Sequence, residues 1–237
     1  MNIKIEVLYP EFCNLYGDTG NILYLKEKLL RMGAEVDIMY THYGETPFFA
    51  GDNALDFLYI GPCTESQQEL IASELLKYSD KLKEKAENGL FVLATGNSFE
   101  LFGEYIEKCS GEKISCLNWQ PFYAKRFDRL RFNDNCVGNF GDIKITGFKN
   151  QLSHSYGEIK SPFITMLKGA GLNPQAKIEG ISYNNLIATY LIGPILLLNP
   201  PLTAYILKGL LKEDYKEINL PFETQAYEQR ISEIQAH

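Results

Sequence analysis

Short apolar runs alternate with stretches of helical spacing through the first part of the chain. The runs have the length and composition of strands, and turn signals or amphipathic stretches separate them. The runs that predict strands are Ile3 to Leu8, Val36 to Tyr40, Leu55 to Ile60 and Leu90 to Ala94. Strands that alternate with helices are typical of a parallel sheet covered on both faces. We therefore expect an α/β fold, with a doubly wound, mostly parallel sheet and flanking helices in three layers.

Two amphipathic helices are predicted between these strands. The first begins after Asp18 or Thr19, either of which can cap it, and ends at Gly33. The second begins with Thr64 and Gln67, which are spaced as a capping box, and we expect it to run unbroken to Asn88-Gly89. The apolar faces are Ile22, Leu25, Leu29 and Leu30 in the first helix, and Ile71, Leu75, Tyr78 and Leu82 in the second.

The second half of the chain is richer in short β-like runs. No stretch rich in Gly, Ser or Pro divides the two halves, so we expect residues 1–237 to form one domain. Pro200-Pro201 is placed to open a helix, since proline suits the first turn. The predicted elements are strands within Phe122–Phe132, Ile143–Thr146 and Leu186–Leu191, a helix to Leu211, and a helical tail from Phe222 to His237.

Composition narrows the class of protein. The chain has 23 Lys and Arg against 30 Asp and Glu, a net charge of −7, which argues against a nucleic-acid partner. No apolar run is long enough to span a bilayer, and the N-terminus reads as a strand instead of a signal peptide. The five cysteines are odd in number and form no Cys-x-x-Cys, so we expect neither a disulfide framework nor a metal site. These features predict a cytoplasmic protein without a cofactor.

Ligands of doubly wound sheets bind at the carboxyl ends of the strands. Three loops lie there: Tyr9–Asn21, Gly61–Gln68 and Thr95–Gly103. The third loop joins a buried strand to a predicted helix through a tight turn, which is the shape of a nucleophile elbow. Its tip is Gly96, which accepts a positive φ but carries no nucleophile. A plain glycine turn explains the same residues, so the pattern alone leaves both interpretations open.

Several motifs together resemble a known family. The chain is similar to class I glutamine amidotransferases of the cobyric acid synthase type, and most of all to the amidotransferase subunits of lipid II isoglutaminyl synthases. Those subunits work beside a Mur-ligase-like synthetase. The motifs that carry the resemblance are Tyr9–Asn21, Tyr59–Gln68, the elbow, Val137–Asn139, Gly147–Asn150 and Ala188–Pro200.

The chain departs from the family at its chemical positions. The resemblance places the family's nucleophilic cysteine at Gly96 and its general-base histidine at Ile192. The family's double-glycine loop is Gly61-Pro62-Cys63 here, and its Phe-Glu-Asn-His is Phe148-Lys149-Asn150-Gln151. The basic residue expected before Val-Gly-Asn is replaced by Asn135, although Arg129 and Arg131 are near.

The resemblance therefore implies the fold and the class of partner, but not glutamine hydrolysis. We expect a subunit that has lost glutaminase activity and acts as a binding or regulatory partner of a Mur-ligase-like synthetase in cell-wall precursor amidation. One alternative is an active amidotransferase or hydrolase with a relocated nucleophile such as Cys63, next to a helix N-terminus. The other alternative is a stand-alone small-molecule binding protein.

Candidate binding residues follow from the three loops. The emptied pocket is expected to bind a small polar ligand such as glutamine, with the free N–H groups of the helix beside Gly96 available to an anion. The Tyr9–Asn21 loop is expected either to be structural, with Asp18 as a helix cap, or to contribute Tyr16, Asp18 and Asn21 to a ligand or partner surface. The candidate ligand-binding residues are Gly61, Cys63, Thr64, Asn97, Ser98 and Glu100.

Overall fold

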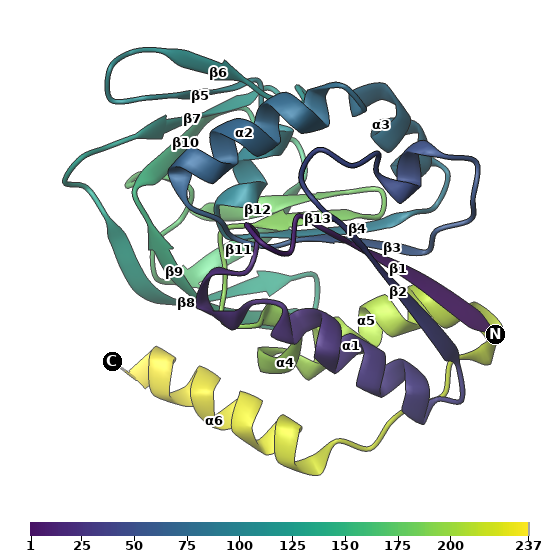
Figure 1. Ribbon diagram of the computed structural model, residues 1–237. Coiled ribbons are helices and arrows are strands. Elements are labelled where there is room, and N and C mark those ends of the chain that lie inside the picture. The colour runs from purple at the N-terminus through teal and green to yellow at the C-terminus, as the bar shows by residue number, and fades with distance from the viewer. Residues whose placement is uncertain (237) are drawn as a thin grey trace.

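The computed structural model describes residues 1–236 and is built around one nine-stranded sheet (Figure 1). The strand order is β2-β1-β3-β4-β13-β12-β11-β8-β9. Every pairing from β2 to β13 is parallel, as predicted for the doubly wound part of the fold. The parallel strands are Asn2–Leu8 (β1), Glu35–Thr41 (β2), Phe57–Ile60 (β3), Phe91–Thr95 (β4) and Leu186–Thr189 (β13).

The second half of the chain extends this sheet with antiparallel strands, so the whole sheet is mixed. β12 pairs with β13, and β11, β8 and β9 follow in antiparallel order. A separate four-stranded sheet has the order β10-β7-β5-β6. The remaining strands are Tyr105–Glu107 (β5), Lys113–Ser115 (β6), Phe122–Arg126 (β7), Phe132–Phe140 (β8), Ile143–Gln151 (β9), Ser153–Gly157 (β10), Pro162–Lys168 (β11) and Ile178–Tyr183 (β12).

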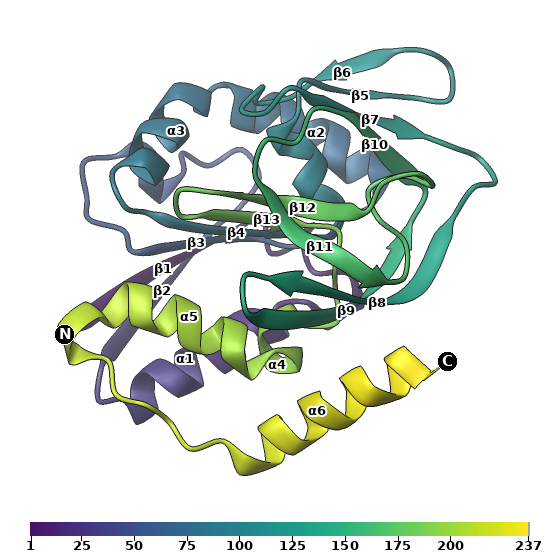
Figure 2. The same cartoon turned by 180° about the vertical axis from the view of Figure 1, so that it is seen from behind.

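Helices cover both faces of the parallel strands (Figures 1 and 2). One apolar core lies under α2 and α3, and a second lies under α1, α4 and α5. The last helix, α6, lies against this second layer and β8 and buries only Ile231. The helices are Gly20–Arg31 (α1), Glu65–Leu76 (α2), Ser79–Glu87 (α3), Ile195–Leu198 (α4), Pro200–Leu211 (α5) and Pro221–Ala236 (α6). Short 3-10 turns occupy Leu15–Gly17, Phe48–Ala50, Gly96–Phe102 and Lys212–Asp214.

Some local predictions are wrong for identifiable reasons. The single helix expected after Thr64 is two helices, because the backbone leaves the helical region at Tyr78, whose ring packs on Phe49. Leu30 is half exposed instead of buried, because the covered face of α1 is narrower than its apolar stripe. Neither Asp18 nor Thr19 caps α1 through its side chain. The capping box of Thr64 is confirmed.

The elbow region also differs from the prediction. The turn after β4 continues as a 3-10 helix that ends at Phe102, so Ile106 belongs to β5 and not to a helix. The expected strand Phe122–Phe132 is divided between β7 and β8 by a turn-rich loop. The predicted tail helix is present as α6, and His237 lies outside the described residues. No helix in the described part of the chain has the length and apolarity needed to cross a bilayer.

Candidate functional site

Gly96 lies at the carboxyl edge of the parallel strands, directly after β4. Because β4 and β13 are parallel neighbours, with Thr95 opposite Thr189, the segments that follow them leave the sheet side by side. Gly96 has φ +60°, and a Cβ atom added to it would lie 3.3 Å from Cγ2 of Ile192. The two residues that the resemblance assigns to nucleophile and base therefore lie side by side and line one cavity, as glycine and isoleucine.

Pro62 occupies the space above Gly96. A Cβ atom added at position 96 would lie only 2.5 Å from Cβ of Pro62, closer than real carbon atoms approach. The loop that carries Pro62 is fixed on both sides, since the Leu15 amide donates to the Pro62 carbonyl at 3.1 Å and the Ser98 hydroxyl donates to the Gly61 carbonyl at 2.6 Å. A side chain at position 96 therefore has no room unless this loop moves.

A buried polar cluster lies beneath the turn. The Asp18 carboxylate accepts hydrogen bonds from the Tyr59 hydroxyl at 2.7 Å, from the Thr95 hydroxyl and from the Gly193 amide at 3.3 Å. The Asn21 amide oxygen accepts from the Leu196 amide at 2.9 Å. Burial raises the pKa of Asp18, although these donors oppose the shift. The cluster joins the start of α1 to β3, β4 and the segment before α4.

The cluster corrects the expectation of a partner surface in this loop. Asp18 and Asn21 are fully buried, so neither can form a ligand or partner surface. Tyr16 is 55% exposed and is the only one of the three that remains on a surface. Asp18 is structural, as the alternative interpretation held, but it bridges strands instead of capping a helix.

A cavity of about 120 Å³ opens beside Gly96 and Ile192. Cys63, Thr64 and Asn97 line it, whereas Gly61, Ser98 and Glu100 do not, so three of the six candidate ligand-binding residues lie outside it. The other residues of the lining are Leu15, Tyr16, Pro62, Glu65, Arg131, Asn150, Gln151, Leu152 and Ser153.

The polar residues predicted to bind a ligand in this cavity are already engaged in hydrogen bonds within the chain. The side-chain oxygen of Asn97 accepts from the Cys63 amide at 3.0 Å, and its NH₂ group donates to the Cys63 carbonyl at 2.9 Å. Thr64 is engaged in the capping box of α2. These groups hold the two loops together. The turn at Gly96 opens only a seven-residue 3-10 helix, which is too short for the anion site that was expected there.

Glu100 lies behind the cavity wall. Its carboxylate accepts from Nε2 of Gln68 at 2.9 Å and from the Tyr190 hydroxyl at 3.0 Å. Burial raises the pKa of Glu100, and its hydrogen bonds partly oppose the shift. Glu100 thus supports the turn from behind and is not placed to touch a ligand.

Sequence reasoning did not assign a role to the polar residues on the opposite wall. The Arg131 guanidinium donates to the Asn150 side-chain oxygen, and the Asn150 NH₂ group donates to the Tyr16 hydroxyl at 3.0 Å. Gln151 donates from Nε2 to the Ser153 carbonyl at 2.7 Å, and its Oε1 atom is buried without a partner. The available signal was the departure from Phe-Glu-Asn-His at Lys149 and Gln151, which flank Asn150.

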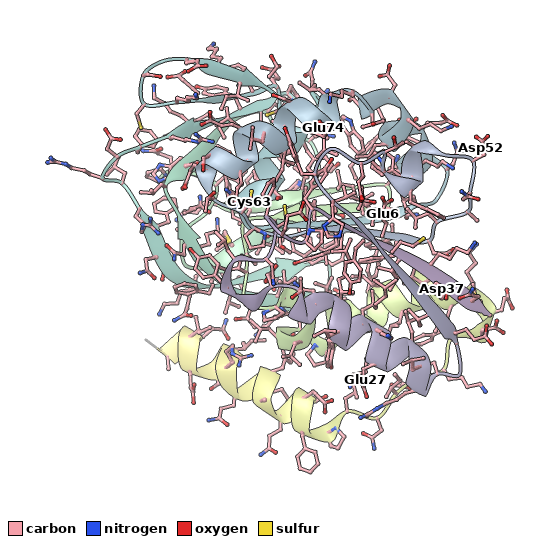
Figure 3. All side chains as sticks on the ribbon, in the orientation of Figure 1. Glu6, Glu27, Asp37, Asp52, Cys63 and Glu74 are labelled. Atoms are coloured by element: carbon pink, nitrogen blue, oxygen red, sulfur yellow. The ribbon has the colours of Figure 1, made fainter. Side chains whose placement is uncertain are left out.

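The alternative nucleophile Cys63 has no basic partner among the described residues. Its side chain is 3% exposed and packs in the core beneath α2 (Figure 3). Burial, together with the neighbouring Cys63 thiol, holds the pKa of Cys13 well above its usual range. His42 is paired with Glu11 at 3.0 Å on the surface and does not line the cavity.

The other described histidine, His154, is also unsuited to act as a base here. It is buried between the rings of Phe127 and Phe132, at centroid distances of 4.9 and 4.2 Å. Burial lowers the pKa of His154, which favours the neutral ring. No group of three or more His, Cys, Asp or Glu within residues 1–236 could hold a metal ion.

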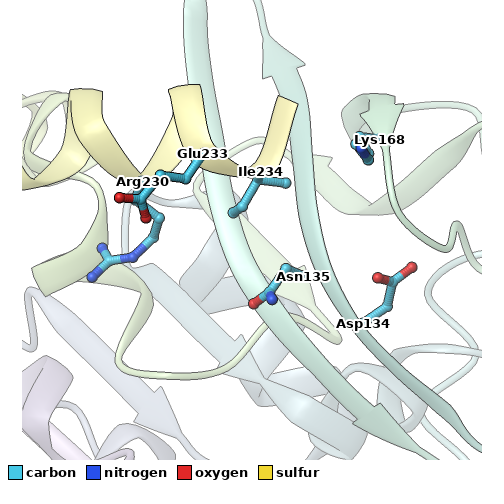
Figure 4. Close-up of a pocket in the computed structure, with 6 residues that line it drawn as sticks. All are labelled: Asp134, Asn135, Lys168, Arg230, Glu233 and Ile234. Atoms are coloured by element: carbon cyan, nitrogen blue, oxygen red, sulfur yellow. The ribbon is translucent and has the colours of Figure 1, made fainter. Parts of the chain in front are cut away.

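A larger hollow of about 690 Å³ lies between α6 and β8 (Figure 4). Asn135 lines this hollow and not the cavity beside Gly96, with Asp134, Lys168 and Arg230 around it. The basic residue at the cavity is instead Arg131. The larger hollow is therefore separate from the turn that the family resemblance singles out.

The comparisons identify the family. Residues 4–199 match the CobB/CobQ-like glutamine amidotransferase domain, and the chain belongs to this family. The chain is 30% identical over 98% of its length to the lipid II isoglutaminyl synthase (glutamine-hydrolyzing) subunit GatD of Streptococcus pneumoniae, of which it covers 89%. It is 30% identical over 94% of its length to the protein of the same name from Staphylococcus aureus, of which it covers 88%.

Solved structures agree on the fold. A glutamine amidotransferase crystal structure superposes with a TM-score of 0.54 at 17% identity, covering 87% of this chain and 98% of the other. The glutaminase domain of Trypanosoma brucei CTPS with bound acivicin superposes with a TM-score of 0.53 at 10% identity, covering 90% and 96%. At these identities the likeness establishes a class I glutamine amidotransferase-like architecture and nothing about chemistry.

Proposed function

We propose that this protein is a non-hydrolysing glutamine amidotransferase-like subunit of a lipid II amidating enzyme. It acts as a binding or regulatory partner of a Mur-ligase-like synthetase. The observation that carries the proposal is that Gly96 and Ile192 lie side by side at the edge of the parallel strands. These are the two positions where the family resemblance places a nucleophile and a base.

Amide hydrolysis through a covalent intermediate needs a nucleophile, a base within hydrogen-bond reach and donors for the oxyanion. Glycine supplies no nucleophile, and isoleucine accepts no proton. Pro62 adds a third obstacle, because it has no N–H to donate and its ring fills the space above Gly96. Loss of nucleophile and base leaves at most weak residual catalysis.

The partner class is supported by the relatives. Both are named as subunits of lipid II isoglutaminyl synthase, and this chain covers 89% and 88% of their lengths. The buried cluster around Asp18 holds the framework of the fold without the residues at positions 96 and 192, so a surface that depends on that framework does not require the chemistry. A subunit of this kind would leave the synthetase dependent on free ammonia or on another source of nitrogen.

The test is to reconstitute the protein with its candidate Mur-ligase-like synthetase and supply lipid II and ATP. We expect the complex to form, and to amidate lipid II with ammonium chloride but not with glutamine as the only nitrogen source. Glutamine-dependent amidation at the ammonium-dependent rate would contradict loss of activity. Failure of the two proteins to co-purify would instead favour a stand-alone binding protein.

The relocated nucleophile has its own test. Cys63 is buried against Asn97 and Cys13, so its alkylation by iodoacetamide near neutral pH should be slow and without effect on amidation. The exposed Cys109 serves as the reference thiol in the same sample. Faster modification of Cys63 than of Cys109, with loss of glutamine-dependent activity, would support catalysis by Cys63.

A further inference from the structure

The outer edge of β2 has no partner strand in the described part of the chain. β2 is the first strand of the nine-stranded sheet and pairs with β1 alone. The amide of Glu35 and the carbonyl of Thr41 both bond on the β1 side. Because these directions alternate along a strand, Val36, Ile38 and Tyr40 point their N–H and C=O groups away from β1. No described residue forms a hydrogen bond with these outward groups.

This edge lacks the features that usually keep edge strands apart. Natural proteins protect such edges with a lysine, a proline or a bulge. β2 reads Glu-Val-Asp-Ile-Met-Tyr-Thr, which contains neither residue, and its register with β1 is continuous. Tyr40 is 53% exposed, and Leu23 and Leu30 are 64% and 50% exposed on the neighbouring helix α1. A free backbone edge and exposed apolar side chains therefore occur together.

The strand is complementary to itself in one antiparallel register. When Ile38 lies opposite Ile38 of a second copy, Val36 lies opposite Tyr40, and all the outward groups fall in hydrogen-bonded pairs. The side chains of these residues share one face of the sheet, where Val36 and Ile38 pack against the core under α1. Pairs between aromatic and β-branched side chains on one face stabilise antiparallel strands.

Charge favours the same register. In the register centred on Ile38, Asp37 lies opposite the neutral Met39 of the second copy. A register centred on Asp37 would place two carboxylates directly opposite each other, which destabilises a strand pair. A register centred on Met39 leaves the outward groups of Val36 without a partner. Of the three, the register centred on Ile38 alone pairs every outward group and keeps like charges from lying opposite each other.

We propose that the protein self-associates through β2, which pairs with β2 of a second copy about a two-fold axis at Ile38. Such an interface is isologous, so it closes at two copies. The exposed Leu23 and Leu30 of each copy lie on the helix that packs beside the joined edge. Because the paired strands run in opposite directions, the two turns at Gly96 lie at opposite ends of the joined sheet. The proposal does not depend on the proposed function.

The dimer is expected to be weak. One strand and one helix face form a small interface beside the about 1,200–2,000 Å² of specific, stable complexes, so we expect a dissociation constant of about 10–100 µM. Each copy also carries a net charge of −7, whose repulsion is screened by salt. Association should therefore strengthen as the salt concentration is raised from about 20 to about 150 mM.

Sedimentation velocity of the purified full chain, from about 5 to about 500 µM at the higher salt concentration, tests the proposal. We expect the weight-average mass to rise from that of one copy toward that of two, and to go no further. A chain that stays monomeric throughout would overturn the proposal and leave the edge to a strand of a different protein. Growth beyond two copies would overturn the closed two-fold pairing.

Charge variants test the register. Ile38→Lys places two ammonium groups opposite each other at the two-fold axis, and Ile38→Glu places two carboxylates there. Each should raise the dissociation constant at least about tenfold, whereas an equimolar mixture of the two variants should dimerise again because opposite charges then meet. The matched control is Leu70→Lys, because Leu70 is 45% exposed on α2, on the other face of the sheet. It should leave the dissociation constant unchanged.

A proline variant tests the backbone pairing separately. Tyr40→Pro removes an N–H that points away from β1, so it spares the ladder within the chain but should weaken the dimer. Circular dichroism checks that each variant is folded. Equal effects of Ile38→Lys and Leu70→Lys, a mixture no more associated than either variant alone, or unchanged association of Tyr40→Pro would each contradict the proposed pairing.

Discussion

Two neighbouring regions at the edge of the parallel strands differ sharply in how their polar groups are satisfied. In the buried cluster, the Asp18 carboxylate receives hydrogen bonds from Tyr59, Thr95 and Gly193. In the wall of the neighbouring cavity, Oε1 of Gln151 is buried with no partner among residues 1–236, and an apolar Ile192 lies beside Gly96. One region is complete within the chain, and the other is not.

The difference distinguishes residues that hold the fold together from residues that only line the cavity. The cluster ties α1, β3, β4 and the segment before α4 together, so the architecture of this chain depends on it. The cavity residues are not part of these hydrogen bonds, so they can differ without loss of the fold. The incomplete region is therefore where a ligand or a changed function is to be sought.

The largest predicted effect comes from breaking the complete region. Asp18→Ala removes the carboxylate that accepts from the Thr95 and Tyr59 hydroxyls and from the Gly193 amide. The Tyr59 hydroxyl keeps the backbone carbonyl of residue 18 as an acceptor at 2.9 Å, whereas the other two donors lose this acceptor at about 1–3 kcal/mol each. We expect the free energy of unfolding in urea to fall by at least about 3 kcal/mol. The matched control is the exposed Asp37→Ala, which should change it by less than about 0.5 kcal/mol. Equal effects of the two substitutions would refute the structural role of the cluster.

A smaller effect is expected from filling the turn itself. Gly96→Ala places a Cβ atom 2.5 Å from Pro62 at φ +60°, and should cost about 2–3 kcal/mol by urea unfolding. Gly33→Ala is the matched control, because Gly33 has φ +83° with nothing within 4 Å, so it reports backbone strain alone at about 1 kcal/mol. In a Pro62→Gly background the cost of Gly96→Ala should fall toward that of Gly33→Ala. Additivity of the two changes would show that Pro62 is not the obstacle.

The turn at position 96 belongs to the part of the fold that could be predicted from the sequence. The strand–helix alternation predicted the parallel half of the sheet, because buried parallel strands and amphipathic helices have strong periodicities. The turn at Gly96 was predicted from the spacing of its flanking apolar residues, and its positive φ is present. The family motifs also gave the neighbour of Gly96 as Ile192, which is distant from it in the sequence.

The cavity wall was not predictable in the same way. Arg131 and Gln151 come from a loop and from the end of β9, and the sheet brings them to Gly96 through antiparallel pairings that no local pattern specifies. Burial of Asp18 and Asn21 was missed because both look like exposed loop residues until Tyr59 and Leu196 supply their partners. The break at Tyr78 depended on a contact with distant Phe49.

A third, still smaller effect concerns pH. Burial raises the pKa of Glu100 above the ordinary value of 4.5, so the folded protein binds this proton more tightly than the unfolded chain does. The contribution of Glu100 to the free energy of unfolding is therefore fully present below pH 4.5 and is lost as the pH rises through the folded-state pKa. Between pH 4.5 and neutrality, Glu100→Gln should flatten the decline in the free energy of unfolding. The exposed Glu104→Gln should leave the slope as it is, and an equal slope in both variants would contradict the assignment.

The smallest effect is expected at the rim of the incomplete region. Tyr16→Phe removes the hydroxyl that accepts from Asn150 at 3.0 Å, but water can solvate the Asn150 NH₂ group in its absence. We expect the free energy of unfolding to change by less than about 0.5 kcal/mol in urea titrations. A loss approaching that of Asp18→Ala would mean that the rim belongs to the structural framework, and the contrast between the two regions would fail.

The most direct test of lost glutaminase activity is ammonia release from glutamine by the purified protein, alone and together with its candidate synthetase. We predict no release above the uncatalysed rate in either sample, because Gly96 supplies no nucleophile and Ile192 no base. A glutaminase turnover number of about 1 per second or more, in the ordinary range of enzymes, would contradict it.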